Sequence, residues 1–168
     1  RIRPRTYLAL TGCRFDTTPL VADILPRDVR RDLEMDLGIS GRTAAIAAGS
    51  AGLGLGAAKA LAADGVRVAI CGRDAAKLAA AAATIDGDVI TLEADLSIPN
   101  SGREFVENAT SALGHLDILV TNAGGPPPGT FADTDLDAYQ TAFDMNCISM
   151  IEMCRTAIPA MRERGWGR

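Results

Sequence analysis

The sequence predicts an α/β fold with a doubly wound parallel sheet, and three observations support this prediction. Short apolar runs alternate with helical patterns, a cluster of glycines follows the first apolar run, and the composition is that of a globular domain. The chain has 168 residues, of which 48% are hydrophobic and 23% are charged. A single domain of ordinary size accounts for this length.

The apolar runs are the expected strands, and they cover residues 43–48, 66–71, 89–93 and 116–121. The segments between them, residues 53–64, 75–84 and 100–113, have helical patterns. Strands that alternate with helices predict a parallel sheet with helices on both faces, and near-continuous apolar strands fit that burial. The right-handed crossover rule then places a reversal of strand order between the first and fourth strands, where ligands bind.

Two further segments flank this pattern. Residues 1–34 carry seven arginines against five acidic residues, whereas the remainder has ten basic against sixteen acidic residues. Because Met35 also begins a plausible domain opening, we expect residues 1–34 to be an extension outside the fold and residues 35–168 to form the domain. A longer helix is expected over residues 135–162, and its apolar side chains are expected in the core or in a subunit interface: Phe143, Met150, Ile151, Met153, Cys154, Ile158 and Met161.

Charge and cysteine usage limit the partners. The formal net charge is −4 and basic residues do not gather on one periodic face, so we expect neither nucleic acid nor membrane as a partner. The four cysteines lack metal-ligand spacing and His115 is the only histidine, which argues against a metal site and favours reduced thiols in the cytoplasm. No apolar run approaches the roughly 20 residues of a membrane span.

The stretch "AAGSAGLGLGAAK", residues 47–59, places glycines between the first expected strand and the first expected helix. Glycines there let the backbone approach a pyrophosphate at the positive end of the helix, and Gly52 and Gly54 are the predicted contacts. The spacing to Ala57 permits the variant G-x-G-x-x-A fingerprint. We expect Gly49 in the turn and Gly56 in helix packing; a tight turn without a ligand is the alternative interpretation.

The end of the second strand bears on cofactor choice. An acidic residue in this region would bind the ribose 2′-hydroxyl of NAD, but the sequence has Gly72 and Arg73. A cation without a competing carboxylate favours NADP over NAD. The alternative is that Arg73 is a solvated surface residue beside Asp74, which is a plausible N-cap.

Several motifs together resemble the short-chain dehydrogenase/reductase family. "AAGSAGLG" (47–54) resembles its T-G-x-x-x-G-x-G turn, and "LDILVTNAGG" (116–125) is similar to its N-N-A-G segment. "EADLS" (93–97) and "FDMNCISMIEMCRTAIPAM" (143–161) are similar to its third strand end and its long helix. The resemblance runs from about residue 37 to residue 168, with departures at Ala47, Ala48 and Thr121.

The resemblance implies a Rossmann-like dinucleotide site. It assigns the pyrophosphate to Ser50, Gly52, Leu53 and Gly54, the 2′-phosphate to Arg73, the adenine border to Asp95 and Leu96, and the nicotinamide ribose side to Asn122, Ala123 and Gly124. It also implies hydride transfer between NADP and a small carbonyl or alcohol substrate, with Asn146 as a catalytic asparagine. A satisfied structural amide is the other interpretation of Asn146.

The family's catalytic serine and its Y-x-x-x-K pair have no match here, and we expect them beyond Arg168. We then expect the chain to be an inactive fragment of an NADP-dependent reductase, with 3-oxoacyl-carrier-protein reductases as a candidate class and a sheet incomplete at its C-terminal side. The complete protein is expected to be a homo-oligomer. The alternative is a non-catalytic dinucleotide-binding or interaction module, whereas a methyltransferase leaves Arg73 and the "TNAGG" segment unexplained.

Overall fold

The structure is a computed structural model that describes residues 36–125 and 128–168. The extension expected at residues 1–34 lies outside the described residues, so its boundary stays a prediction. One compact unit spans Leu37–Arg168.

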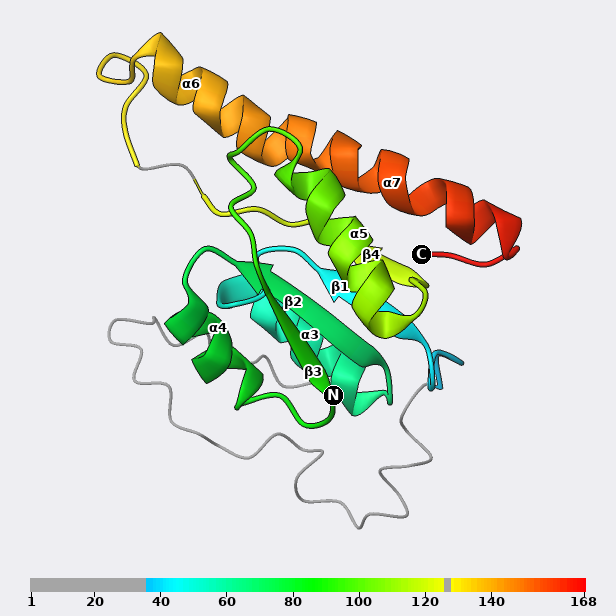
Figure 1. Cartoon of the computed structure of the whole chain (residues 1–168). Helices are drawn as coiled ribbons and strands as arrows, with labels where there is room; N and C mark the ends of the chain where they lie inside the picture. Colours follow the sequence, from blue (N-terminus) through cyan, green and yellow to red (C-terminus); the bar gives the residue numbers. More distant parts are fainter. Residues whose placement is uncertain (1–35, 126–127) are drawn as a thin grey trace, which may run out of the picture. The chain divides into compact units, whose positions relative to one another are not determined.

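Four parallel strands form the central sheet (Figure 1): β1 (Thr43–Ile46), β2 (Arg67–Gly72), β3 (Val89–Glu93) and β4 (Ile118–Val120). Their order is β3-β2-β1-β4, and Ala45 pairs with Ala69 on one side and Leu119 on the other. The chain therefore reverses its direction across the sheet between β1 and β4. This confirms the predicted doubly wound fold and the predicted reversal point.

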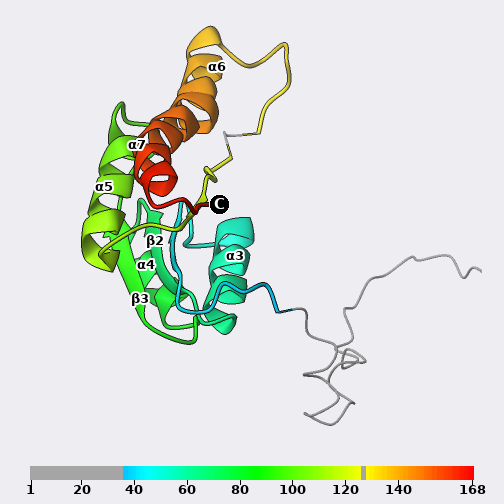
Figure 2. The ribbon, with the colours of Figure 1, turned by 90° about the vertical axis from the view of Figure 1, so that its right-hand side faces the viewer.

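Helices cover both faces of the sheet, and Figure 2 shows α3 on the opposite side of the strands from α5 and α7. The bounds are α3 (Gly52–Ala63), α4 (Ala75–Ala82), α5 (Ser101–Leu113), α6 (Leu136–Phe143), a π-helical segment η1 (Asp144–Ile148) and α7 (Ser149–Glu163). Side chains that alternate along the strands fill two separate cores. Ile46 and Ile70 pack on the face of α3 and α4, whereas Ala45 and Ala69 pack with Phe105 on the face of α5.

The helix predicted at residues 135–162 contains a π-helical turn, which the sequence pattern did not indicate. The Ser149 amide donates to the Asp144 carbonyl, five residues earlier, and the Ser149 hydroxyl donates to the Met145 carbonyl at 2.5 Å. A buried hydroxyl thus satisfies a carbonyl at the π-turn. The helix then continues through Pro159, within α7.

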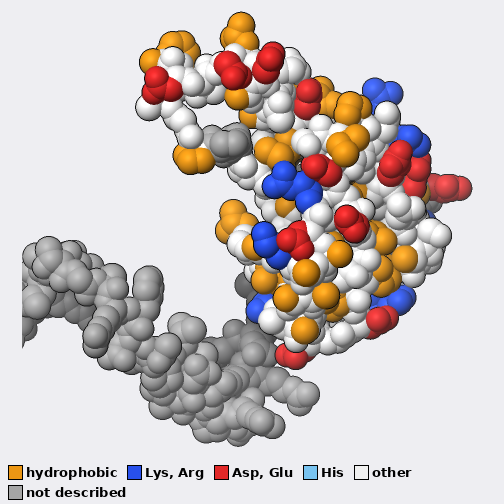
Figure 3. All heavy atoms as spheres, turned by 60° about the vertical axis from the view of Figure 1, so that its left-hand side comes forward, with side chains coloured by type: hydrophobic (Ala, Val, Ile, Leu, Met, Phe, Trp, Pro, Cys, Tyr) orange, Lys and Arg blue, Asp and Glu red, His pale blue; other side chains and the backbone are white. Residues whose placement is uncertain are grey.

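The apolar side chains of this helix divide between two surroundings. Met153 and Met161 are buried against α5 and the sheet, as the core interpretation predicts. Cys154 is partly buried, and the remaining members are exposed: Phe143, Met150, Ile151 and Ile158. Figure 3 shows apolar side chains beside acidic ones at the surface of the α6 end. Among the residues that the structure describes, no helix is long and apolar enough to cross a bilayer.

A buried carboxylate joins β1 to β4 at the side of the sheet where the amino ends of the strands lie, which we call the amino edge. Asp117 Oδ2 accepts from the Thr43 amide at 3.3 Å and lies 3.1 Å from His115 Nε2. Arg42 and Arg164 each place a guanidinium nitrogen 3.8 Å from Asp117 Oδ1. The Asp117 side chain is only 3% exposed, so its charge depends on these partners.

The C-terminal residues pack beside this network. Trp166 has the Arg42 guanidinium 4.0 Å from its ring centroid and that of Arg168 at 5.1 Å. The Arg168 amide donates to the Asp117 carbonyl, and the Leu119 amide donates to the Arg168 carbonyl. This pattern is that of a parallel strand pair, so Arg168 lies on the outer edge of β4.

Candidate functional site

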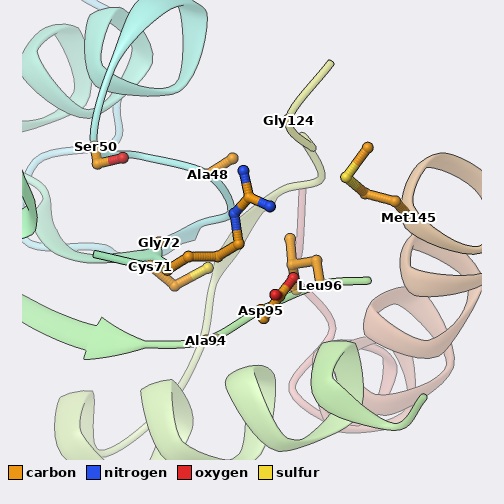
Figure 4. Close-up of a pocket in the computed structure, with 10 residues that line it drawn as sticks. Ala48, Ser50, Cys71, Gly72, Ala94, Asp95, Leu96, Gly124 and Met145 are labelled. Atoms are coloured by element: carbon orange, nitrogen blue, oxygen red, sulfur yellow. The ribbon is translucent and has the colours of Figure 1, made fainter. Parts of the chain in front are cut away.

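A pocket opens at the carboxyl ends of the strands, which we call the carboxyl edge of the sheet, beside the point where the strand order reverses (Figure 4). Figure 4 places Ser50 and Met145 on opposite sides of this pocket. The lining combines the turn after β1, the ends of β2 and β3, the loop after β4 and η1: Ala48, Ser50, Cys71, Gly72, Arg73, Ala94, Asp95, Leu96, Gly124 and Met145. Five of the predicted site residues are therefore brought together: Ser50, Arg73, Asp95, Leu96 and Gly124.

Two glycines allow the turn after β1 to close tightly. A Cβ at Gly49 would lie 2.7 Å from Ile70 Cβ, and one at Gly54 would lie 2.3 Å from the Ala48 carbonyl oxygen. No side chain fits at either position without movement of the backbone or of β2. Gly54 is buried and does not line the pocket, so its direct effect is the close approach of α3 to β1.

The amino end of α3 is left open. Gly52 begins the helix with a φ of +56° and no atom within 4 Å of a Cβ position. The N-cap Ala51 makes no side-chain hydrogen bond, and the first turn has no acidic residue. By contrast, Asp74 and Asp135 accept from backbone amides at the starts of α4 and α6. The first amides of α3 thus have no capping side chain and are suited to an anionic group.

Two other residues of the glycine-rich stretch, Leu53 and Gly56, lie away from the pocket. Leu53 is 87% exposed and is not part of the lining. Gly56 is exposed, and a Cβ there would meet nothing within 4 Å. The expectation that Gly56 serves helix packing is therefore wrong, because no neighbouring element approaches it.

The end of β2 forms one wall of the pocket. Arg73 is exposed at the rim, whereas Cys71 and Gly72 are buried. A Cβ at Gly72 would lie 3.0 Å from Ser50 Oγ, so a larger residue here would displace Ser50. Burial raises the pKa of the Cys71 thiol to about 11, which leaves it protonated and unreactive at neutral pH.

Asp95 forms another wall, directly after β3. Its Oδ1 accepts from the Ser97 amide at 3.0 Å and from the Ser97 hydroxyl at 2.7 Å. Partial burial opposes its ionisation, but these hydrogen bonds and the positive charge of Arg73 together lower the pKa of Asp95. Leu96 is 7% exposed and adds an apolar surface. A negatively charged and a positively charged side chain, Asp95 and Arg73, therefore both line this pocket.

Of the three predicted residues after β4, only one lines the pocket. Gly124 lines the pocket, with Met145 Sδ 3.9 Å from its Cβ position. Asn122 is half-buried and its amide donates to the Ala48 carbonyl at 3.5 Å, which ties the end of β4 to the turn after β1. Ala123 is half-buried and is not in the lining.

Asn146 lies in the π-helical segment next to Met145, which lines the pocket. Its side chain is exposed and donates to the Ala142 carbonyl at 2.9 Å. This bond stays within its own helix and on its exposed side, so it is not the buried partner that the structural-amide interpretation expects. π-helical turns within α-helices occur frequently at functional sites, and this one lies beside the pocket.

Metal chemistry has no support within the described residues. Cys71, Cys147 and Cys154 are free thiols, and no group of histidine, cysteine and acidic side chains in that part of the chain could hold a metal ion.

Five lining residues were not among the predicted binding residues: Ala48, Cys71, Gly72, Ala94 and Met145. The signal for Met145 was present in the sequence. Met145, Ser149 and Met153 recur every four residues and are buried, so this stripe indicates which side of the long helix faces the sheet. Ala94 and Cys71 adjoin predicted residues at the ends of strands, where neighbours in sequence are neighbours in the pocket.

Comparison with known proteins agrees with this architecture. The profile of the short chain dehydrogenase family matches residues 42–168, which include all four strands and the pocket. The chain belongs to the short-chain dehydrogenase family. It is 34% identical over 133 residues to D-beta-hydroxybutyrate dehydrogenase of Cupriavidus necator, covering 77% of this chain and 52% of that protein. It is 32% identical over 133 residues to ketoacyl reductase HetN of Nostoc sp., covering 77% and 46%.

Solved structures of two reductases have the same fold. L-sorbose reductase from Gluconobacter frateurii, complexed with NADPH and L-sorbose, matches with a TM-score of 0.73 at 31% identity, over 79% of this chain and 52% of that one. A 3-oxoacyl-(acyl-carrier-protein) reductase from Agrobacterium tumefaciens with NADP bound matches with a TM-score of 0.70 at 30% identity, over 82% and 55%. The chain spans about half the length of the relatives that it matches.

Proposed function

We propose that this chain is the dinucleotide-binding part of an NADP-dependent oxidoreductase that transfers a hydride between the nicotinamide and a small carbonyl or alcohol. The observation that carries the proposal is the pocket at the reversal point, where Ser50, Arg73 and Asp95 meet beside the uncapped start of α3. The ketoacyl reductase among the relatives and the NADP-bound reductases among the solved structures support the same reaction class.

The residues present fit a dinucleotide. The open space at Gly52 and the uncapped amides of α3 suit a pyrophosphate, with Ser50 beside them. Asp95 and Leu96 offer a hydrogen-bond acceptor and an apolar surface to the adenine. Gly124 leaves room on the nicotinamide side. When bound, the dinucleotide supplies the hydride chemistry, and these residues bind and orient it.

Preference for NADP rests on Arg73. Its guanidinium lines the rim of the pocket, and Gly72 leaves no carboxylate to repel a ribose 2′-phosphate. The close approach between a Gly72 Cβ and Ser50 Oγ, 3.0 Å, means that an acidic side chain is accommodated there only if Ser50 moves. Both features favour NADP over NAD.

We also infer that the chain by itself does not turn over its cofactor. The sequence has two lysines, Lys59 and Lys77, and neither follows a tyrosine at the Y-x-x-x-K spacing. Asn146 is the one residue that we assign to the catalytic machinery, as a positioning residue beside the pocket. The second candidate, a dinucleotide-binding module without catalysis, is favoured by the same lack of a tyrosine and lysine pair.

Calorimetric titration with NADPH and NADH tests the proposal. We expect NADPH to bind more tightly, and Arg73→Ala to weaken NADPH binding by about tenfold to a hundredfold, the value of a charge-assisted hydrogen bond, with NADH binding unchanged. Arg155→Ala is the matched control, because Arg155 is an exposed arginine outside the pocket. Equal binding of NADPH by the wild type and Arg73→Ala would remove the NADP assignment.

Oligomerisation is a separate part of the proposal. The exposed apolar residues Phe143, Met150 and Ile151 lie along one helix that the rest of the described chain does not cover. We infer that they form a homo-oligomer interface in the complete protein. Sedimentation of wild type and Ile151→Glu measures it, and an unchanged mass would count against this helix as the interface.

A further inference from the structure

Ala48 is held in a backbone conformation that disfavours its side chain. Its φ is +48°, and Asn100 is the only other non-glycine residue with positive φ in the described segments. Asparagine tolerates this left-handed region, whereas alanine rarely adopts it because Cβ crowds the backbone. The strain at Ala48 therefore calls for a cause in its surroundings.

Hydrogen bonds on both sides impose this conformation. The Ala47 amide donates to the Val120 carbonyl at 3.0 Å, and the Gly49 amide donates to the Cys71 carbonyl at 2.8 Å. The Ala48 carbonyl faces the Asn122 amide and the close approach of α3. The chain is thus held to β4 one residue before Ala48 and to β2 one residue after it, which favours the left-handed conformation between these two bonds.

The strained backbone leaves the methyl group of Ala48 in the wall of the pocket, as Figure 4 shows. The same pocket contains Arg73 and Asp95, the residues that we assign to the adenosine half of the dinucleotide. Gly49, the next residue, has no space for a side chain but a backbone that needs no glycine. At Ala48 the situation is reversed, since the backbone favours glycine and the sequence supplies a methyl group.

We propose that Ala48 limits the affinity for the cofactor, because its methyl group occupies space in the adenosine part of the pocket. This inference rests on the proposed function, because it needs a dinucleotide in the pocket. Removal of the methyl group has two effects that act together. It widens the pocket, and it removes the steric strain of a Cβ at a positive φ.

The test compares wild type with Ala48→Gly by calorimetric titration with NADPH and with adenosine 2′,5′-bisphosphate, a ligand that lacks the nicotinamide half. We expect Ala48→Gly to bind both ligands about three- to tenfold more tightly, by the same factor. Ala48→Ser adds an oxygen atom at the same place and is expected to bind both several-fold more weakly. This second variant keeps the test decisive if Ala48→Gly is poorly folded.

Two glycine variants serve as controls. Ala132→Gly makes the same chemical change at an exposed position in a turn, outside the pocket. Asn100→Gly relieves the other positive φ, at the start of α5. Neither is expected to change ligand affinity.

The outcomes separate this inference from the proposed function. If wild type and Ala48→Gly bind NADPH with the same affinity, or if Ala48→Gly binds more weakly, Ala48 does not limit binding and the inference is wrong. If both proteins are folded by circular dichroism but neither binds NADPH or NADH, the proposed function fails and this inference fails with it.

Discussion

The two edges of the sheet are built in opposite ways. At the amino edge, the buried Asp117 carboxylate is surrounded by charged and hydrogen-bonding side chains that join β1 to β4. At the carboxyl edge, α3 begins without a capping side chain, Ala48 has a positive φ, and Ser50, Arg73 and Asp95 line an open pocket. One edge satisfies its polar groups within the protein, whereas the other leaves them available to a ligand.

This difference teaches where stability and recognition are located. Thr43 begins β1 inside the Asp117 network, and Ala48 follows the end of the same strand. The start of β1 is therefore stabilised by hydrogen bonds and ion pairs within the protein, whereas the residue after its end lines the pocket. Substitutions at the amino edge should lower the free energy of unfolding with little effect on the affinity of the folded protein, while substitutions at the carboxyl edge should affect binding directly.

The largest effect is expected from Asp117→Asn, which breaks the anchoring edge. The substitution removes the buried negative charge and leaves Arg42 and Arg164 uncompensated, so we expect the free energy of unfolding to fall by about 2–4 kcal/mol. Urea denaturation measures this loss. Asp88→Asn is the matched control, because the Asp88 ion pair with Arg67 is exposed and should be worth less than about 1 kcal/mol.

The comparison between the edges also predicts what Asp117→Asn leaves intact. NADPH affinity, measured on the folded fraction, should stay within about twofold of wild type, because the pocket lies at the other end of the strands. A large loss of NADPH affinity in fully folded Asp117→Asn would show that the two edges are coupled, and the assignment of stability to one edge and binding to the other would be wrong.

The next effect is expected from Gly54→Ala, at the carboxyl edge. The added Cβ would lie 2.3 Å from the Ala48 carbonyl oxygen, so α3 must move away from the turn. We expect a loss of about 1–3 kcal/mol in the free energy of unfolding, together with the loss of measurable NADPH binding. Circular dichroism melting and calorimetric titration report the two effects.

Gly56→Ala sharpens this prediction, since it makes the same change two residues later in the same helix. A Cβ at Gly56 meets nothing within 4 Å, so the better helix propensity of alanine should raise the free energy of unfolding by about 0.5–1 kcal/mol. NADPH affinity should not change. If Gly56→Ala destabilises the protein or removes binding, then the opposite roles assigned to these two glycines are wrong.

The sequence predicted the fold well because burial imposes strong patterns. The four strands are apolar and lie within two residues of their predicted starts, and the order of strands follows from the handedness of the crossovers. The π-turn at Asp144 was not predictable, because it depends on the Ser149 hydroxyl and on the packing of the helix. Local propensity does not encode such a change of hydrogen-bond register.

The site was predicted only in part. Ser50, Arg73 and Asp95 were found because strand ends and known motifs mark them in the sequence. The distinction between Gly54 and Gly56 needs the distance to the Ala48 carbonyl, and the role of Asp117 needs the contact of β1 with β4. Both depend on neighbours distant in the chain, for which a motif contains no information.

The smallest effect is expected from the Asp95 carboxylate, which tests whether the carboxyl edge also contributes to stability. Because hydrogen bonds from Ser97 and the charge of Arg73 lower its folded pKa below the ordinary value of 3.8, folding favours the ionised form. The contribution is therefore present above the unfolded pKa and is lost as the pH falls through the folded pKa. Urea denaturation at about pH 5.5 and pH 3 should show a smaller acid-induced loss in Asp95→Asn than in wild type. Ser97→Ala, which removes one donor, should fall between them. If the three proteins lose stability equally on acidification, the Ser97 bonds do not favour the ionised form of Asp95 in the folded protein.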